Sequence, residues 1–79
     1  MPTVLRKDGF RFFFYSNEND EPAHIHVEKG NAEGKIWLVP RTEIAYMYGF
    51  SNAEVRQIVV IVFENYEQFK TKWDGHFSK

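Results

Sequence analysis

Residues 23–28 alternate apolar and polar side chains, a pattern that an extended strand sorts onto two faces. Ile25 and Val27 alternate with His24, His26 and Glu28. A strand has a period of two residues, so the three polar side chains share one face and the two apolar side chains share the other. The segment therefore predicts a strand that packs on a core with one face and presents two imidazoles on the opposite face.

The length and composition of the chain predict one small domain over residues 1–79. The chain has no cysteine, which excludes disulfides and thiolate metal sites and suits a reducing compartment, so we expect a cytoplasmic protein. Its 8 Phe, 4 Tyr and 2 Trp can supply a core to a short chain. The longest apolar run, residues 58–63, is far shorter than the roughly 20 residues that cross a bilayer, so no membrane partner is expected.

Four strands are predicted, over residues 3–6, 10–16, 23–29 and 35–39. Asp8 and Gly9 suit a type I′ hairpin turn between the first two strands. Two glycines among polar residues make 30–34 a second hairpin loop, and Pro40 ends the fourth strand because it cannot donate to a ladder. This order of strands and turns predicts an antiparallel meander.

Two helices are predicted after the strands. A short helix over residues 41–48 would end at Gly49 in a left-handed cap. Ser51 and Glu54 then form a capping box that starts a long helix over residues 52–73, whose apolar residues fall in one stripe at helical spacing. The predicted fold class is therefore α+β, a four-stranded antiparallel meander sheet with the short helix and the long C-terminal helix packed on one face.

Polarity assigns the strand residues to two faces of this sheet. The core face is predicted to hold Phe10, Phe12, Phe14, Ile25, Val27, Ile36 and Leu38. The opposite face is predicted to hold Arg11, Phe13, Tyr15, His24, His26, Glu28, Lys35 and Trp37. We expect this second face, with its rings, imidazoles and cations, to stay uncovered.

His24 and His26 are candidate metal ligands, because side chains two residues apart on a strand lie about 6.5 Å apart along the chain. A divalent transition metal would need a third ligand, and Glu28 lies about 13 Å from His24 along the strand. The remaining candidates for the third ligand are the acidic loop residues, a neighbouring strand or His76, none with a diagnostic spacing. The acidic loop residues are Glu18, Asp20 and Glu21. No cofactor is expected, and the sequence does not decide whether a divalent transition metal binds.

His24 and His26 are also candidate catalytic residues. Two neighbouring histidines can act as base and acid in RNA cleavage, with Arg11 or Lys35 stabilising the charged phosphate. We favour a structural role over this catalytic one: both histidines are strand residues that hydrogen-bond to their neighbours.

The aromatic face suits two kinds of partner. Phe13, Tyr15 and Trp37 beside Arg11 and Lys35 resemble the stacking platform of single-strand RNA readers. The same residue types anchor protein interfaces, and the net charge of −1 gives no general attraction to nucleic acid, so a protein interface is favoured. Three apolar residues off the helical stripe widen the apolar surface, unless the helix predicted over 41–48 covers them. They are Val60, Ile61 and Phe63.

Five segments of the chain resemble the small prokaryotic family known as domain of unknown function 4160. These are residues 1–6, 9–18, 21–30, 32–38 and 48–51, and the most specific part is the Pro-x-His-x-His-Val block of residues 22–27. The resemblance implies a standalone protein, encoded beside a second small protein in pairs proposed to be toxin–antitoxin modules. It implies no reaction.

The leading hypothesis is a cytoplasmic binding component of a toxin–antitoxin-like pair, which uses the His and aromatic sheet face to bind a small protein encoded by a neighbouring gene or a second copy of itself. Two alternatives stay open: a small ribonuclease or metal-dependent hydrolase centred on His24 and His26, and an RNA-binding module without catalysis.

Overall fold

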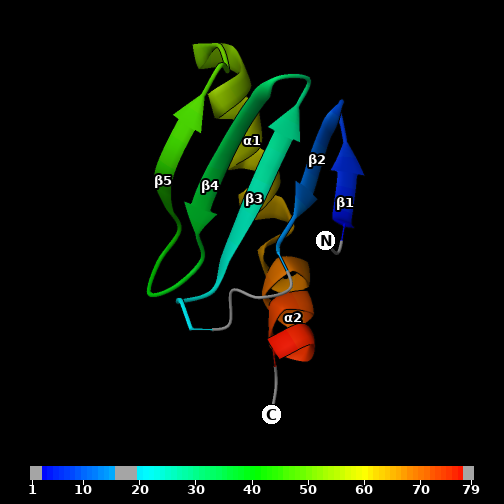
Figure 1. Ribbon diagram of the computed structural model, residues 1–79, viewed down its shortest axis with the longest axis vertical. Helices are drawn as coiled ribbons and strands as arrows, with labels where there is room; N and C mark the ends of the chain where they lie inside the picture. The colour runs from blue at the N-terminus through cyan, green and yellow to red at the C-terminus, as the bar shows by residue number, and fades with distance from the viewer. Residues whose placement is uncertain (1–2, 16–19, 78–79) are drawn as a thin grey trace.

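The computed structural model describes residues 3–15 and 20–77, which form one antiparallel sheet backed by helices (Figure 1). The strands follow one another across the sheet in chain order, and each pairs antiparallel with the next. The α+β class is confirmed, but the sheet has five strands where four were predicted. The elements are β1 (Thr3–Lys7), β2 (Phe10–Phe13), β3 (His24–Lys29), β4 (Ala32–Trp37), β5 (Glu43–Tyr48), α1 (Asn52–Glu64) and α2 (Tyr66–Phe77).

Tight turns set the register of the first four strands. Asp8 and Gly9 have φ of 55° and 86°, which confirms the type I′ geometry of the β1–β2 turn. The β3–β4 turn uses only residues 30 and 31, so β4 begins at Ala32, earlier than predicted, and ends at Trp37. β2 ends at Phe13, and residue 16, the last residue of the predicted second strand, lies outside the described residues.

The prediction of a short helix over residues 41–48 is wrong, because Glu43–Tyr48 pairs with β4 as the fifth strand. Ile44 lies opposite Ile36 and Tyr46 lies opposite Lys35, so Ala45 is an extra residue that bulges the strand. Gly49 does adopt a left-handed φ of 85°, but it turns the chain from a strand into α1 rather than ending a helix.

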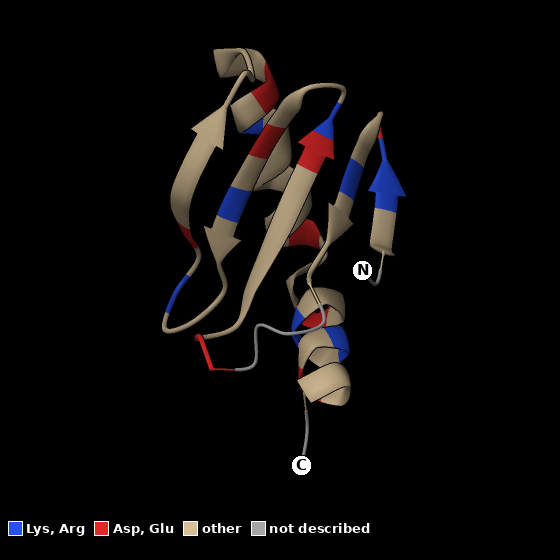
Figure 2. Ribbon diagram, in the orientation of Figure 1, with Lys and Arg blue, Asp and Glu red and all other residues tan. Residues whose placement is uncertain are grey.

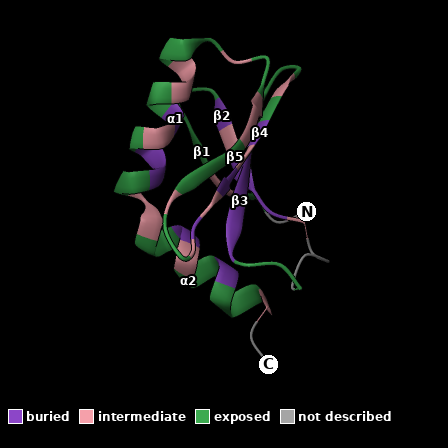
Figure 3. Cartoon of the chain, turned by 90° about the vertical axis from the view of Figure 1, so that its left-hand side faces the viewer, coloured by how far each residue is buried: buried purple, intermediate pink, exposed green. Residues whose placement is uncertain are grey.

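The predicted capping box is confirmed, but the single helix over 52–73 is wrong. Glu54 N donates to Ser51 Oγ, and Ser51 N donates to the Glu54 carboxylate. α1 ends at Glu64 and is capped by Asn65, whose backbone N–H and side-chain amide both donate to the carbonyl of Ile61. α2 then starts at Tyr66 and runs in a different direction from α1 (Figure 3).

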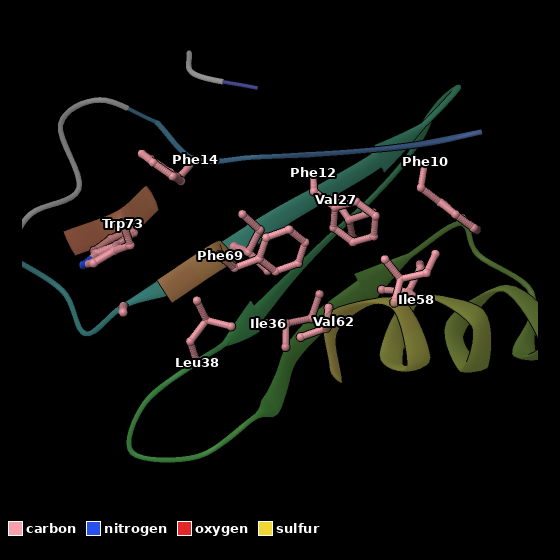
Figure 4. Close-up of a cluster of buried hydrophobic side chains, with 13 residues drawn as sticks. Phe10, Phe12, Phe14, Val27, Ile36, Leu38, Ile58, Val62, Phe69 and Trp73 are labelled. Carbon is pink, nitrogen blue, oxygen red and sulfur yellow. The ribbon is translucent and has the colours of Figure 1, made fainter. Parts of the chain in front are cut away.

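Both helices pack on one face of the sheet, where they bury the predicted core residues (Figures 3 and 4). All seven strand residues assigned to the core face are buried, as predicted. Both α1 and α2 contribute side chains to this core. The centroids of the Phe12 ring, from the sheet, and the Phe69 ring, from α2, lie 5.4 Å apart. The helix residues of the core are Ile58, Ile61, Val62, Phe69 and Trp73.

Candidate functional site

The candidate site is the sheet face opposite the helices. We call it the ring face, and it consists of the predicted residues Arg11, Phe13, Tyr15, His24, His26, Lys35 and Trp37. Strand pairing brings these residues together: Phe13 lies opposite His26, His26 opposite Lys35, and His24 opposite Trp37. The predicted assignment of these strand residues to one face is therefore confirmed. Tyr15 follows the end of β2 and contacts both Phe13 and His26.

His26 lies among the rings at the middle of this face. The Phe13 ring stacks on it with centroids 5.5 Å apart and an interplanar angle of 25°. The Tyr15 ring meets it edge-on at 4.8 Å, and the His24 ring meets it edge-on at 5.1 Å. Because these rings surround the imidazole, only 6% of His26 is exposed.

His24 is fully buried, with 0% exposure, at the end of the ring face nearest α2. Its Nδ1 lies 2.9 Å from the carbonyl oxygen of Pro22. A carbonyl can only accept, so Nδ1 carries the proton and donates. Trp37 and Trp73 flank the imidazole at 5.4 and 4.8 Å, and the contribution of Trp73 was missed because its helical spacing marked it as a core residue only.

Each cation of the ring face lies over an aromatic ring and pairs with a carboxylate. The Arg11 guanidinium is 4.3 Å from the Phe13 centroid and 2.7 Å from Glu28. Lys35 Nζ is 4.2 Å from the Trp37 centroid and 2.7 Å from Glu21.

These pairs leave little exposed positive charge at the centre of the face. Arg11 and Lys35 have only 15% and 13% of their side chains exposed, whereas Glu28 and Glu21 have 42% exposed. Basic and acidic positions accordingly lie side by side across the sheet (Figure 2). The expectation of an uncovered face is thus wrong at its centre, because the cations of the face cover its own rings.

Glu21, a predicted candidate for the third metal ligand, binds Lys35 and lies 3.8 Å from His24 Nδ1. His76, another candidate, contacts the core residue Phe14 with centroids 5.2 Å apart. Within residues 3–15 and 20–77, no three His, Cys, Asp or Glu side chains lie close enough together to hold a metal ion. Glu18 lies outside the described residues, so the metal site stays a prediction.

For acid–base chemistry, the arrangement supplies two adjacent imidazoles but restricts access to them. With Nδ1–H of His24 bound to a carbonyl, the lone pair of its neutral ring lies on Nε2, the atom a general base would use. That Nε2 is buried. A general base must come within hydrogen-bond reach of the proton it abstracts, so a substrate could reach this atom only after the surrounding rings moved.

Two tyrosines that sequence reasoning missed extend the ring face onto β5. Tyr46 lies opposite Lys35, and its ring stacks on that of Tyr48 with centroids 5.1 Å apart. Tyr48 is 62% exposed. The two tyrosines alternate with Met47, which is the pattern of a strand. This pattern was overlooked because residues 41–48 were assigned to a helix.

The apolar residues noted on α1 divide into two groups. Ile61 is buried in the core, whereas Val60 and Phe63 are 52% and 66% exposed. The segment expected to cover them is β5, which continues the sheet instead of packing on α1. Phe63 lies beside the chain leading into β5, where it lines a hollow with Arg41, Thr42 and Tyr66.

Comparison with known proteins gives one match. The model of the family described as Domain of unknown function (DUF4160) matches residues 9–74, which include every residue of the ring face. No curated protein and no solved structure matches the chain. Among the described residues, neither helix has the length and apolar character needed to cross a membrane.

Proposed function

Because the chain belongs to the DUF4160 family, whose description names no activity, we propose its function from the ring face: the recognition of a protein partner. The resemblance to this family, which implies pairs proposed to be toxin–antitoxin modules, supplies the candidate partner, a small protein encoded by a neighbouring gene. The chain would be the binding component of this pair, and we place it in the cytoplasm. The observation that carries the proposal is the sheet face opposite the helices, on which aromatic rings and ion pairs are already fixed.

Residue type and preorganisation both support this reading. Tyr, Trp and Arg are the residues that most often dominate binding energy at protein interfaces. On this face Lys35 lies over Trp37 and opposite Tyr46, and stacking holds the rings of Tyr46 and Tyr48 against each other. Side chains that are already fixed lose less conformational entropy on binding, so a partner would meet a surface that needs little ordering.

The charge pattern favours protein over RNA. Affinity for RNA depends on cations that neutralise phosphates. Arg11 and Lys35 are paired with Glu28 and Glu21, so a phosphate would have to displace a carboxylate 2.7 Å away from each cation. Alternating charges of both signs suit a protein surface of complementary pattern.

One observation favours a second candidate function, acid–base or metal chemistry at His24. The bond from Nδ1–H to a backbone carbonyl is the arrangement that fixes the tautomer of many catalytic and metal-binding histidines. A small ribonuclease or metal-dependent hydrolase centred on His24 and His26 would lose RNA cleavage in His26→Ala with the fold intact, or would retain a metal through purification. Inert RNA assays together with a metal-free elemental analysis would remove this candidate.

Binding is tested by co-expression with the neighbouring gene product, followed by size-exclusion chromatography and titration calorimetry. We expect a complex whose affinity falls about tenfold or more in Trp37→Ala, the loss typical of an interface anchor. Val60→Ala, which shortens an exposed apolar side chain on the helix layer, should bind as the wild type does. Equal affinities for the two variants would exclude the ring face as the binding surface, and the absence of any complex would exclude this partner.

The RNA-binding alternative is examined with single-stranded RNA oligonucleotides over a range of salt concentrations. A true RNA reader would bind with an affinity that falls steeply with salt and with Trp37→Ala. We expect no such binding.

A further inference from the structure

The outer edge of β5 is open to another strand. β5 is the last strand in the sheet order and pairs with β4 along one edge. Along its other edge, no strand formed by residues 3–15 or 20–77 lies beside it. Such an edge presents a row of backbone donors and acceptors that can pair with another extended chain.

The two edges of the sheet differ in how they oppose such pairing. Both edge strands contain a bulge, but β1 also carries Arg6 and Lys7, which are exposed. Lysine and arginine on an edge strand discourage a second strand from docking. β5 has neither a cation nor a proline, and it exposes Ile44 and Tyr48. The β5 edge therefore lacks the protection that the β1 edge has.

We propose that the β5 edge pairs with β5 of a second copy of this chain, in an antiparallel arrangement about a twofold axis. In the register that pairs all six residues of the strand, Glu43 lies opposite Tyr48 of the other copy and Ile44 lies opposite Met47. This proposal goes beyond the proposed function, because it rests on the backbone edge of β5; Tyr48 is the one residue of its argument that the extended ring face shares.

The strand is complementary to itself in this register. Ile44 and Met47 lie opposite Ile36 and Gly34 of β4, both on the helix side of the sheet. Glu43 and Tyr48 lie opposite Trp37 and Glu33, both on the ring-face side. The pairs of Glu43 with Tyr48 and of Ile44 with Met47 therefore join residues of the same face, even though the bulge at Ala45 interrupts the strand. A shift by one residue would place ring-face side chains opposite helix-side chains.

The pairing also provides partners for side chains that are exposed in the unpaired chain. The Tyr48 hydroxyl could donate to the Glu43 carboxylate across the axis, once on each side of it. Ile44, 42% exposed, would be covered by Met47 of the second copy. Because the faces match, the helices of both copies lie on the same side of the joined sheet.

Single cysteines test the register, since the chain has none of its own. Opposed residues of antiparallel strands have Cα atoms about 4.5–5.5 Å apart, within disulfide range. Mixing Glu43→Cys with Tyr48→Cys should therefore give a cross-linked dimer under mild oxidation. Glu43→Cys alone should cross-link poorly, because its two thiols would lie about 17 Å apart along the strands.

Tyr48→Cys mixed with Thr71→Cys, an exposed position on α2, measures cross-linking by random collision. If the mixture of positions 43 and 48 cross-links no better than this control, the proposed register is wrong.

Sedimentation equilibrium at up to about 1 mM protein tests the dimer itself. The wild type should be a dimer, and Ala45→Lys, which places a cation near the axis on each copy, should be at least tenfold weaker in self-association. Thr71→Lys adds the same charge on α2 and should dimerise as the wild type does, while circular dichroism confirms that each variant is folded. A monomeric wild type would overturn the proposal, even if its edge captured a strand of another protein.

Discussion

Gly49 and Gly75 differ in whether their positions require glycine. Gly49 joins β5 to α1 with a φ of +85°, and a Cβ atom added there would lie 3.1 Å from both Cα and Cβ of Ala32. Gly75 lies within α2, and a Cβ added there would meet no heavy atom within 4 Å. The first position therefore needs glycine for its backbone and for space, whereas the second needs neither.

Alanine should accordingly act in opposite directions at these two positions. Gly49→Ala should lower the free energy of unfolding by about 1–2 kcal/mol, the cost of a left-handed non-glycine residue. Gly75→Ala should raise it by about 0.5–1 kcal/mol, because glycine loses more backbone entropy than alanine in a helix. Urea unfolding of both variants checks the pair, and a destabilised Gly75→Ala would show that α2 does not hold its helical form at that residue.

At the scale of single residues, the sequence was sufficient to predict which side chains share a face of the sheet. It was not sufficient to predict how exposed those side chains are. Alternation put His24 and His26 on one face, and the register confirms it. Their burial depends on rings of the neighbouring strands, with Phe13 stacked on His26 and Trp37 edge-on to His24. Alternation within one strand carries no information about such contacts between strands.

At the scale of elements, the start of α1 depends on one charged side chain. The Glu54 carboxylate accepts from the backbone N–H of Ser51 and lies 3.4 Å from Lys29. The hydrogen bond from the Ser51 backbone lowers the pKa of Glu54 below its ordinary value of 4.5, because that bond favours the charged form. Lys29, at the end of β3, acts in the same direction and links the sheet to the helix.

This pKa shift predicts an acid-sensitive contribution to stability. A pKa lower in the folded state than in the unfolded state stabilises the fold above the unfolded value, and the contribution is lost as the pH falls through the folded value. The stability difference between wild type and Glu54→Gln should therefore be constant near neutral pH and should shrink below about pH 4.5. Urea unfolding across this range measures it, with Glu64→Gln as a control for one charge lost from the same helix. A difference that does not change with pH would contradict the role of the charge.

The elements that sequence reasoning misassigned were decided by contacts distant in the chain. Residues 43–48 contain good strand formers, but the left-handed Gly49 fits both a helix end and a turn, and only the pairing with β4 selects the strand. The break at Asn65 was concealed because Val62, Tyr66 and Phe69 keep helical spacing across it. Spacing predicts which side chains face the core and cannot show where one helix ends and the next begins.

At the scale of the whole molecule, stability should be greatest at the centre of the sheet. β3 pairs with a strand on each side, and its residues from His24 to Val27 are all buried. β1 is an edge strand whose residues are exposed or half-buried. Such differences in burial and pairing set how readily each part of a fold opens.

Native-state hydrogen exchange should follow this order. The amides of β3 are expected to exchange only through global unfolding and therefore to be the slowest, whereas those of β1 should exchange through local opening of the edge. Exchange followed by NMR, at several low denaturant concentrations, separates the two routes. Equal protection of the two strands would mean that the sheet opens as one unit.

The position of His24 between two indole rings has a spectroscopic consequence. The chain has 2 tryptophans, and both Trp37 and Trp73 contact this imidazole. All of the intrinsic tryptophan fluorescence therefore comes from the immediate surroundings of one histidine, one emitter on the sheet and the other on α2. Tryptophan emission from the unlabelled protein should therefore report on the surroundings of His24, which is fully buried.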